Sequence, residues 1–255
     1  MIDNYNELVD YLNLRNKSHS FNFYSEYLDK LPDSIKVIIE AERFLKPSHL
    51  SQDVCKKLFA TMAIKTEPQF IFDSNNVEIS ELLCYYLRSD SKFIEFNSEY
   101  NMLKGIMILG SLGTGKTILL KTVSNFLSIF EENNYNYRPG FRIIPSHRMS
   151  ANFIKHGYDY FDNPSLTSEN VLSDNLGIDD LGAENKINYY GTQINVIGEL
   201  MLRRYDKFQN QRKGGLFCTT NLNGDGLKEF YGERVHDRLI EMVNPIILTG
   251  KSRRK

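Results

Sequence analysis

The feature that most constrains this chain is the sequence Gly-Ser-Leu-Gly-Thr-Gly-Lys-Thr at residues 110–117. It matches the pattern G-x-x-x-x-G-K-[ST], in which backbone N–H groups surround phosphate oxygens and the lysine reaches the β- and γ-phosphates. An apolar run at residues 105–109 precedes the loop, and apolar residues follow it at helical spacing. This order of strand, loop and helix places an anion at a helix N-terminus. The sequence therefore predicts a binding site for a nucleoside triphosphate.

The residues expected to bind the nucleotide are Gly110, Ser111, Leu112, Gly113, Thr114, Gly115, Lys116, Thr117 and Ile118. The expected cofactors are ATP and Mg²⁺, with the Thr117 hydroxyl as one metal ligand. A second motif, Leu-Gly-Ile-Asp-Asp-Leu-Gly-Ala-Glu at residues 176–184, ends an apolar run in two carboxylates. It predicts Asp179 as a metal ligand and Asp180 as the catalytic residue that orients or deprotonates the attacking water. Asp180 is one methylene shorter than the glutamate common at this place, and ~1 Å of misplacement can cost ~100-fold, so we expect slow hydrolysis.

Two later segments add candidate catalytic residues. An apolar, β-rich run ends at Asn221, and a strand beside the one carrying Asp179 would bring the Asn221 amide near the γ-phosphate. The alternative is that Asn221 simply begins a turn, since the composition of Asn-Leu-Asn-Gly-Asp-Gly is typical of turns. Further on, Arg234 and Arg238 stand four positions apart, so one helical face can present both guanidinium groups.

Composition sets outer limits on function. The 31 basic and 32 acidic residues of this 255-residue chain nearly cancel, so any nucleic-acid contact must come from a local patch. No run approaches the ~18 apolar residues of a membrane span and no signal segment opens the chain, so we expect a cytoplasmic protein. Cys55, Cys84 and Cys218 are widely spaced, which predicts neither a disulfide framework nor a zinc site.

The first part of the chain differs from the rest. Residues 1–95 carry no phosphate motif, and their apolar residues predict several short helices separated by Pro32 and Pro47. We expect a small helical domain over residues 1–95 and a nucleotide-hydrolysing domain over residues 96–255. The N-terminal domain is either a packing appendage or a domain that binds a partner protein.

The motifs GSLGTGKT, IDDLGAE, TTN and GERVHDRL, in this order, resemble the AAA+ ATPases of the bacterial helicase-loader group, of the DnaC and DnaI type, and the related IstB-type transposition ATPases. The resemblance covers roughly residues 100–250. It implies an α/β fold with a parallel five-stranded sheet, flanking helices and no C-terminal lid. It also implies that Asn221 is the phosphate sensor, that Arg238 reaches the γ-phosphate of a neighbouring subunit, and that Arg234 assists it.

The resemblance also implies partners. Loaders of this type place a ring-shaped replicative helicase on single-stranded DNA and grip the helicase with the N-terminal domain, and they self-associate through the ATP interface. Candidate DNA contacts, which are otherwise a solvated basic face, are Tyr189, Tyr190, Arg203, Arg204, Lys207, Arg212 and Lys213. The basic run at residues 251–255 reads as a charged, frayed terminus.

The motifs are compatible with three functions. The first is a helicase-loading ATPase of DNA replication. The second is an IstB-type ATPase that binds duplex DNA and recruits a transposase. The third is a nucleotide-switched adaptor that hydrolyses ATP slowly.

Overall fold

The structure of the protein is a computed structural model. The residues it describes are 1–17, 30–42, 45–130, 140–163, 165–166, 169, 171–172, 175–211 and 215–253. Two of the candidate DNA contacts, Arg212 and Lys213, lie outside the described residues.

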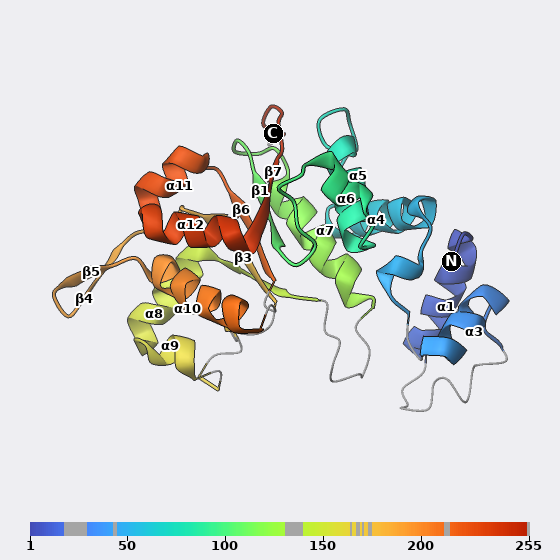
Figure 1. Ribbon diagram of the computed structural model, residues 1–255, viewed down its shortest axis with the longest axis horizontal. Coiled ribbons are helices and arrows are strands. Elements are labelled where there is room, and N and C mark those ends of the chain that lie inside the picture. Colours follow the sequence, from blue (N-terminus) through green and yellow to red (C-terminus); the bar gives the residue numbers. More distant parts are fainter. Residues whose placement is uncertain are drawn as a thin grey trace.

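A five-stranded parallel sheet forms the centre of the fold (Figure 1). Its strands are β1 (Gly105–Leu109), β2 (Arg142–Pro145), β3 (Leu176–Leu181), β6 (Leu216–Thr220) and β7 (Val243–Ile247). Their order across the sheet is β2-β3-β6-β1-β7, so β1 is flanked by two strands that come much later in the chain. Ligands of open α/β sheets bind beyond the carboxyl ends of the strands. The phosphate loop, Asp179 and Asn221 lie at this edge of the sheet, at the ends of β1, β3 and β6.

The strands carry apolar side chains on both faces of the sheet because both faces are covered. On β1, the side chains of Ile106 and Ile108 belong to one hydrophobic core, and Met107 between them belongs to the other. This alternation follows from the two-residue period of a strand. Covering both faces confirms the α/β class that the motifs predict.

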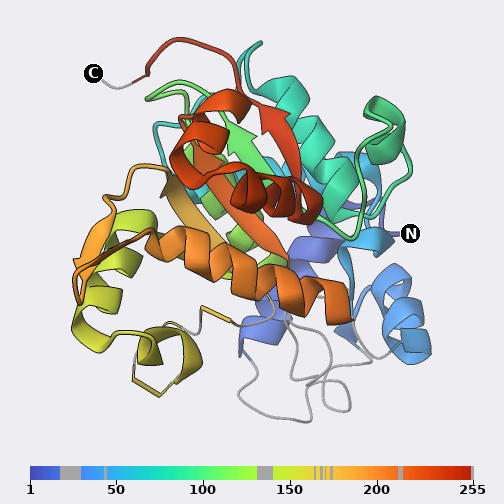
Figure 2. The ribbon, with the colours of Figure 1, turned by 60° about the vertical axis from the view of Figure 1, so that its left-hand side comes forward.

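Helices cover the two faces, as Figures 1 and 2 show together. The helices described after β1 are α7 (Lys116–Ser128), α8 (Ser146–His156), α9 (Asp159–Asp162), α10 (Val196–Gln211), α11 (Gly224–Tyr231) and α12 (Glu233–Met242). Helix α7 supplies the core on one face, while α8, α10 and α12 supply the core on the other. A small antiparallel hairpin of β4 (Ile187–Tyr189) and β5 (Thr192–Ile194) projects between β3 and α10.

Short helices make up the N-terminal part, as the sequence predicts. They are α1 (Tyr5–Lys17), α3 (Asp33–Glu42), the 3₁₀ turn η2 (Pro47–His49), α4 (Gln52–Thr66), α5 (Val77–Leu87) and α6 (Lys92–Phe96). Helix α4 packs on α7, with the rings of Phe59 and Phe126 6.3 Å apart between centroids and Asn125 donating a hydrogen bond to Thr66. Residues before and after position 95 thus share one hydrophobic core, and the division at this position stays a prediction.

Within the described part of the chain, every helix is too short or too polar to cross a lipid bilayer.

Candidate nucleotide-binding site

The phosphate loop joins the end of β1 to the start of α7. Gly113 has φ 77° and Gly115 has φ 103°, both in the left-handed region that an L side chain rarely adopts. Gly115 is the residue that caps α7, so the left-handed turn ends where the free N–H groups of the helix begin. The loop therefore has the local geometry that the motif predicts for binding an anion.

Lys116 is buried at the centre of this loop. Its ammonium group donates to the carbonyl oxygens of Gly110 at 2.8 Å and Ser111 at 2.9 Å, and to Oδ1 of Asn221 at 2.6 Å. Asn221 directly follows β6, which is hydrogen-bonded to both β1 and β3. Lys116 and the expected phosphate sensor are thus in direct contact, and the sensing role of Asn221 stays a prediction.

The two expected metal ligands are also adjacent. The Thr117 hydroxyl donates to Oδ1 of Asp179 at 2.9 Å, and the Thr219 hydroxyl donates to the same oxygen at 2.6 Å. Mg²⁺ prefers oxygen ligands and usually takes only one or two from the protein beside substrate phosphates and water. A hydroxyl and a carboxylate side by side fit that preference. Thr219, which sequence reasoning missed, fixes the Asp179 carboxylate from the neighbouring strand.

Asp180 occupies a distorted part of β3. Its φ is 55°, and the pairing of β3 with β6 shifts register between Ile178 and Leu181. A left-handed non-glycine residue costs on the order of 1 kcal/mol or more and persists only where its surroundings fix it. Here the backbone N–H of Asp180 donates to Thr219 at 2.9 Å, and its carbonyl accepts from Ser146 at 2.7 Å.

The Asp180 carboxylate itself makes no hydrogen bond or ion pair with any described residue. It is half-buried. A rigidly held backbone with a free carboxylate is suited to act on a bound water rather than to hold the fold together.

The two arginines of α12 differ in their surroundings. Arg234 is exposed, whereas the guanidinium of Arg238 lies 4.0 Å from the centroid of the Tyr205 ring on α10, a cation–π contact. Neither guanidinium is hydrogen-bonded or ion-paired to any residue in the described ranges. No contact therefore ties either arginine to the phosphate loop of its own chain.

A buried carboxylate joins the acidic motif to the start of α12. Glu184 accepts hydrogen bonds from the backbone N–H of Gly182 at 2.9 Å and from the hydroxyl of Tyr231. Burial, together with the nearby Glu184 charge, holds the pKa of Tyr231 far above its ordinary value, so its hydroxyl stays a donor. Tyr231 ends α11 one residue before Gly232, where α12 is capped.

The three described candidate DNA contacts on α10 all bind other parts of the same chain. Arg204 is 2% exposed and donates to the carbonyls of Val171 and Gly215, so its prediction as a DNA contact is wrong: it holds two chain segments together. Lys207 donates to the carbonyl of Leu172. Arg203 pairs with Asp162 at 2.5 Å.

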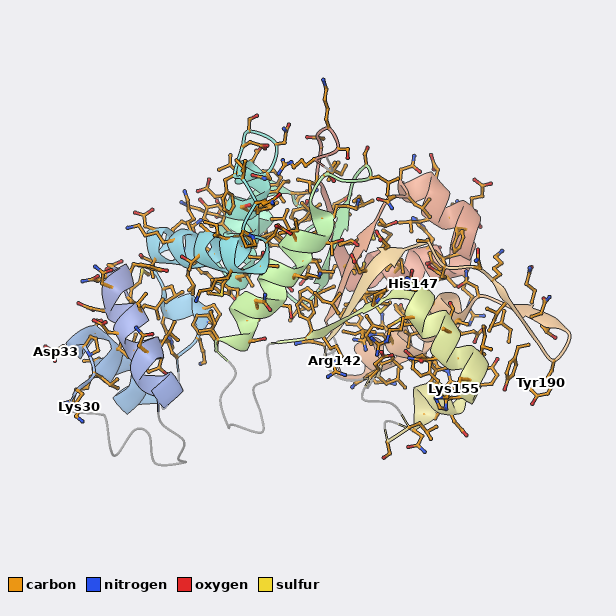
Figure 3. All side chains as sticks on the ribbon, turned by 180° about the vertical axis from the view of Figure 1, so that it is seen from behind. Lys30, Asp33, Arg142, His147, Lys155 and Tyr190 are labelled. Carbon is orange, nitrogen blue, oxygen red and sulfur yellow. The ribbon has the colours of Figure 1, made fainter. Side chains whose placement is uncertain are left out.

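The two candidate tyrosines lie on the β4–β5 hairpin and not on α10. Tyr190 is 92% exposed and lies at the outer tip of the hairpin (Figure 3). Tyr190 and Gly191 both have positive φ, 49° and 82°, as a tight two-residue hairpin turn requires. Beside the hairpin is a pocket of about 520 Å³ whose walls include Tyr158, Tyr189, Tyr190 and Tyr231.

The strand order and the phosphate loop together define an α/β domain with a P-loop. No protein-family model and no curated protein sequence matches the chain. Among solved structures, it is similar to the DnaC helicase loader, with 18% identity, 72% of this chain and 95% of that chain covered, and a TM-score of 0.47.

It is also similar to DnaA from Aquifex aeolicus with bound AMPPCP, at 17% identity, covering 70% of this chain and 48% of that chain, with a TM-score of 0.47. A third similar structure is domain III of the replication initiation protein DnaA from Thermotoga maritima, at 17% identity, 73% and 66% coverage, and a TM-score of 0.45. At these identities the likeness concerns the fold, and the function rests on the chain's own residues.

Proposed function

We propose that this protein is an ATPase that loads a replicative ring helicase onto single-stranded DNA. The observation that carries the ATPase part is the meeting of Lys116, Asn221, Thr117 and Asp179 at the carboxyl ends of three adjacent strands. These four side chains supply the cation, the amide and the oxygen ligands that a nucleoside triphosphate with Mg²⁺ requires.

Each residue has a separate role in the mechanism. Thr117 and Asp179 would hold Mg²⁺, which supplies charge neutralisation at the phosphates. Lys116 and Asn221 bind and orient the terminal phosphates, and Asp180 accepts a proton from, or orients, the water that attacks. Because the Asp180 side chain is short, hydrolysis is slow and the ATP-bound state persists.

The arginines of α12 act between subunits in this proposal. Arg238 approaches the phosphates of a neighbouring subunit and Arg234 assists it, since no bond ties either side chain to its own phosphate loop. An arginine supplied from a neighbour makes hydrolysis depend on assembly. Subunits that associate through the ATP interface would then bind DNA with an affinity that depends on whether ATP is bound.

Single-stranded DNA is the proposed nucleic-acid partner. Tyr190 is almost fully exposed in a conformation that a tyrosine rarely adopts, and it stands beside a pocket lined with tyrosines. Unpaired bases can stack on such rings, whereas paired bases of a duplex cannot. This observation favours the loader over an ATPase that binds duplex DNA.

The helicase is proposed to bind the N-terminal helices. Lys30 and Asp33 lie at one end of the molecule and Tyr190 lies at the other, so a protein and a DNA strand could be held at once (Figure 3). On α3, Val37 is 65% exposed, a large apolar side chain that a partner could cover.

The test is capture of a purified ring helicase by the full-length protein with ATP. Val37→Glu should abolish capture, and Ile154→Glu should not, because Ile154 is equally exposed at 63% but lies on α8. Failure of the parent protein to capture a helicase would reject the loader. Capture of a transposase instead would favour the IstB-type alternative.

A further inference from the structure

The segment that follows β7 crosses the tip of the phosphate loop. The backbone N–H of Arg253 donates to the carbonyl of Gly113 at 2.9 Å. A Cβ atom on Gly113 would lie 2.2 Å from Oγ of Ser252 and 3.1 Å from its Cα, so the two backbones touch. We call residues 248–253 the strap. The loop tip cannot shift toward the strap without displacing it.

A second segment, the rim loop at residues 67–76, borders the same phosphate loop. The Phe70 ring lies 3.5 Å from the position of a Cβ atom on Gly115. The rim loop is held by its own hydrogen bonds, because the buried Asn76 side chain donates to the Ile71 carbonyl at 2.9 Å and accepts from Asp73 N–H at 3.0 Å. The rim loop is therefore a fixed edge of the site.

An ion pair joins the strap to the rim loop. The guanidinium of Arg253 lies 2.9 Å from Oδ1 of Asp73, and the side chains are 29% and 40% exposed. The same guanidinium reaches the carbonyl of Ile71 at 3.4 Å. We call this pair the clasp. It connects two segments about 180 positions apart, at the top of the view in Figure 1, where the C-terminus lies near the segment that leads into α5.

Nucleotide binding must change the hydrogen bonds inside the phosphate loop. The ammonium group of Lys116 donates to two carbonyls of its own loop, Gly110 and Ser111. Phosphate oxygens can take the ammonium protons only if the lysine leaves these carbonyls. The strap holds the tip of the loop at Gly113 and so limits how far the loop backbone can move while these bonds change.

We propose that the Asp73–Arg253 clasp is a gate that sets the rate at which nucleotide enters and leaves the phosphate loop. The inference rests on the proposed nucleotide site, whose chemistry it does not alter. A closed clasp slows uptake and release together, so the bound state lasts longer without a large change in affinity. Such a gate suits an ATPase whose output is a long-lived nucleotide-bound assembly.

A purely electrostatic effect of the two side chains on nucleotide binding predicts the opposite result for Asp73. Removal of the Arg253 charge near a phosphate site would weaken binding, whereas removal of the Asp73 charge would strengthen it. A clasp requires that either change speeds up release. The two explanations are therefore separated by the sign of the Asp73 effect.

The experiment measures release of a fluorescent ADP analogue from the full-length protein in a stopped-flow chase with unlabelled ATP. The variants are Asp73→Asn, Arg253→Gln and the double variant. Asn keeps the Oδ1 atom that accepts from Asn75 N–H at 2.9 Å, so the rim loop keeps its turn, while the clasp loses its negative charge. The control is Lys56→Gln, which breaks the exposed pair between Lys56 and Glu81 away from the phosphate loop.

Each single variant should release nucleotide about two- to fivefold faster, the range for a partly exposed ion pair, and the double variant no faster than either. The control should match the parent. Unchanged release, or slower release by Asp73→Asn, would overturn the gate while leaving the proposed function intact. A parent protein that binds no nucleotide would overturn both.

Discussion

The Nζ atom of Lys116 lies 2.6 Å from Oδ1 of Asn221, a residue 105 positions later in the chain. This bond joins the phosphate loop, which follows β1, to the end of the neighbouring strand β6. Asn221→Ala should therefore lower the turnover number more than it weakens ATP binding, because Lys116 still reaches the phosphates but the terminal phosphate loses an orienting amide. Steady-state hydrolysis and equilibrium binding, measured on the same preparation, check this. Equal losses in both would make Asn221 a binding residue only.

Thr219 should tune the metal site through Asp179. Thr219→Val keeps the shape of the side chain but removes the hydroxyl, which donates to Asp179 at 2.6 Å and accepts from the backbone N–H of Asp180 at 2.9 Å. Loss of a group that orients a metal ligand typically costs ~10- to 100-fold in metal affinity. We expect the Mg²⁺ concentration for half-maximal hydrolysis to rise by about tenfold, with activity only partly restored by excess Mg²⁺, because Asp180 also loses its bond to Thr219.

Thr122→Val is the matched control for that change. Thr122 is also buried, but its hydroxyl donates to a carbonyl within α7. Its Mg²⁺ dependence should equal that of the parent. A Thr219→Val protein with unaltered Mg²⁺ dependence would remove Thr219 from the metal site.

The trans arginine can be tested by mixing two inactive proteins. Arg238→Ala should lose roughly 1,000-fold or more in turnover, as expected for an arginine supplied by a neighbour. Asp180→Asn should bind ATP normally and fail to hydrolyse it, because an amide is not a base. Mixed, the first protein offers an intact ATP site and the second an intact arginine, so activity should peak at intermediate ratios.

The same mixture with Arg234→Ala in place of Arg238→Ala ranks the two side chains. A smaller loss for the Arg234 variant is expected, since we propose only an assisting role for it. A flat, inactive mixture of folded, ATP-binding and co-assembling proteins would mean that Arg238 acts within its own chain.

Base stacking on the hairpin is a separate prediction. Tyr190→Ala should weaken binding of single-stranded DNA by roughly five- to 150-fold, the range for losing one stacked base. Phe96→Ala, another exposed aromatic residue but on α6, should leave binding unchanged. Fluorescence anisotropy of a labelled oligonucleotide at fixed salt gives both values. Equal affinities of the Tyr190 variant and the parent would mean that single-stranded DNA does not bind at this pocket.

The local motifs were predictable from sequence because their chemistry depends on neighbours along the chain. The phosphate loop, the Asp179–Asp180 pair and the apolar strands are all contained in short segments. Thr219 was missed because its bond to Asp179 depends on how β3 aligns with β6, including the register shift at Asp180. No spacing within the chain encodes that alignment.

Long-range contacts account for the other differences. Arg204 looked like a surface cation, but the segments around Val171 and Gly215 bury it. The basic run from residue 251 looked like a frayed terminus, but Arg253 is bound to both Gly113 and Asp73. In each case a partner distant in sequence changes what a charged side chain does.

The most direct test of the account is titration of ATP with Mg²⁺ into the parent protein, Lys116→Ala and Lys121→Ala. Lys121 lies on the same helix but is exposed, so its loss should leave affinity unchanged. Charge-assisted bonds to two phosphates should make Lys116→Ala at least about 100-fold weaker, with unchanged circular dichroism. Equal affinity of a folded Lys116→Ala protein and the parent would contradict the assignment of this loop as the nucleotide site.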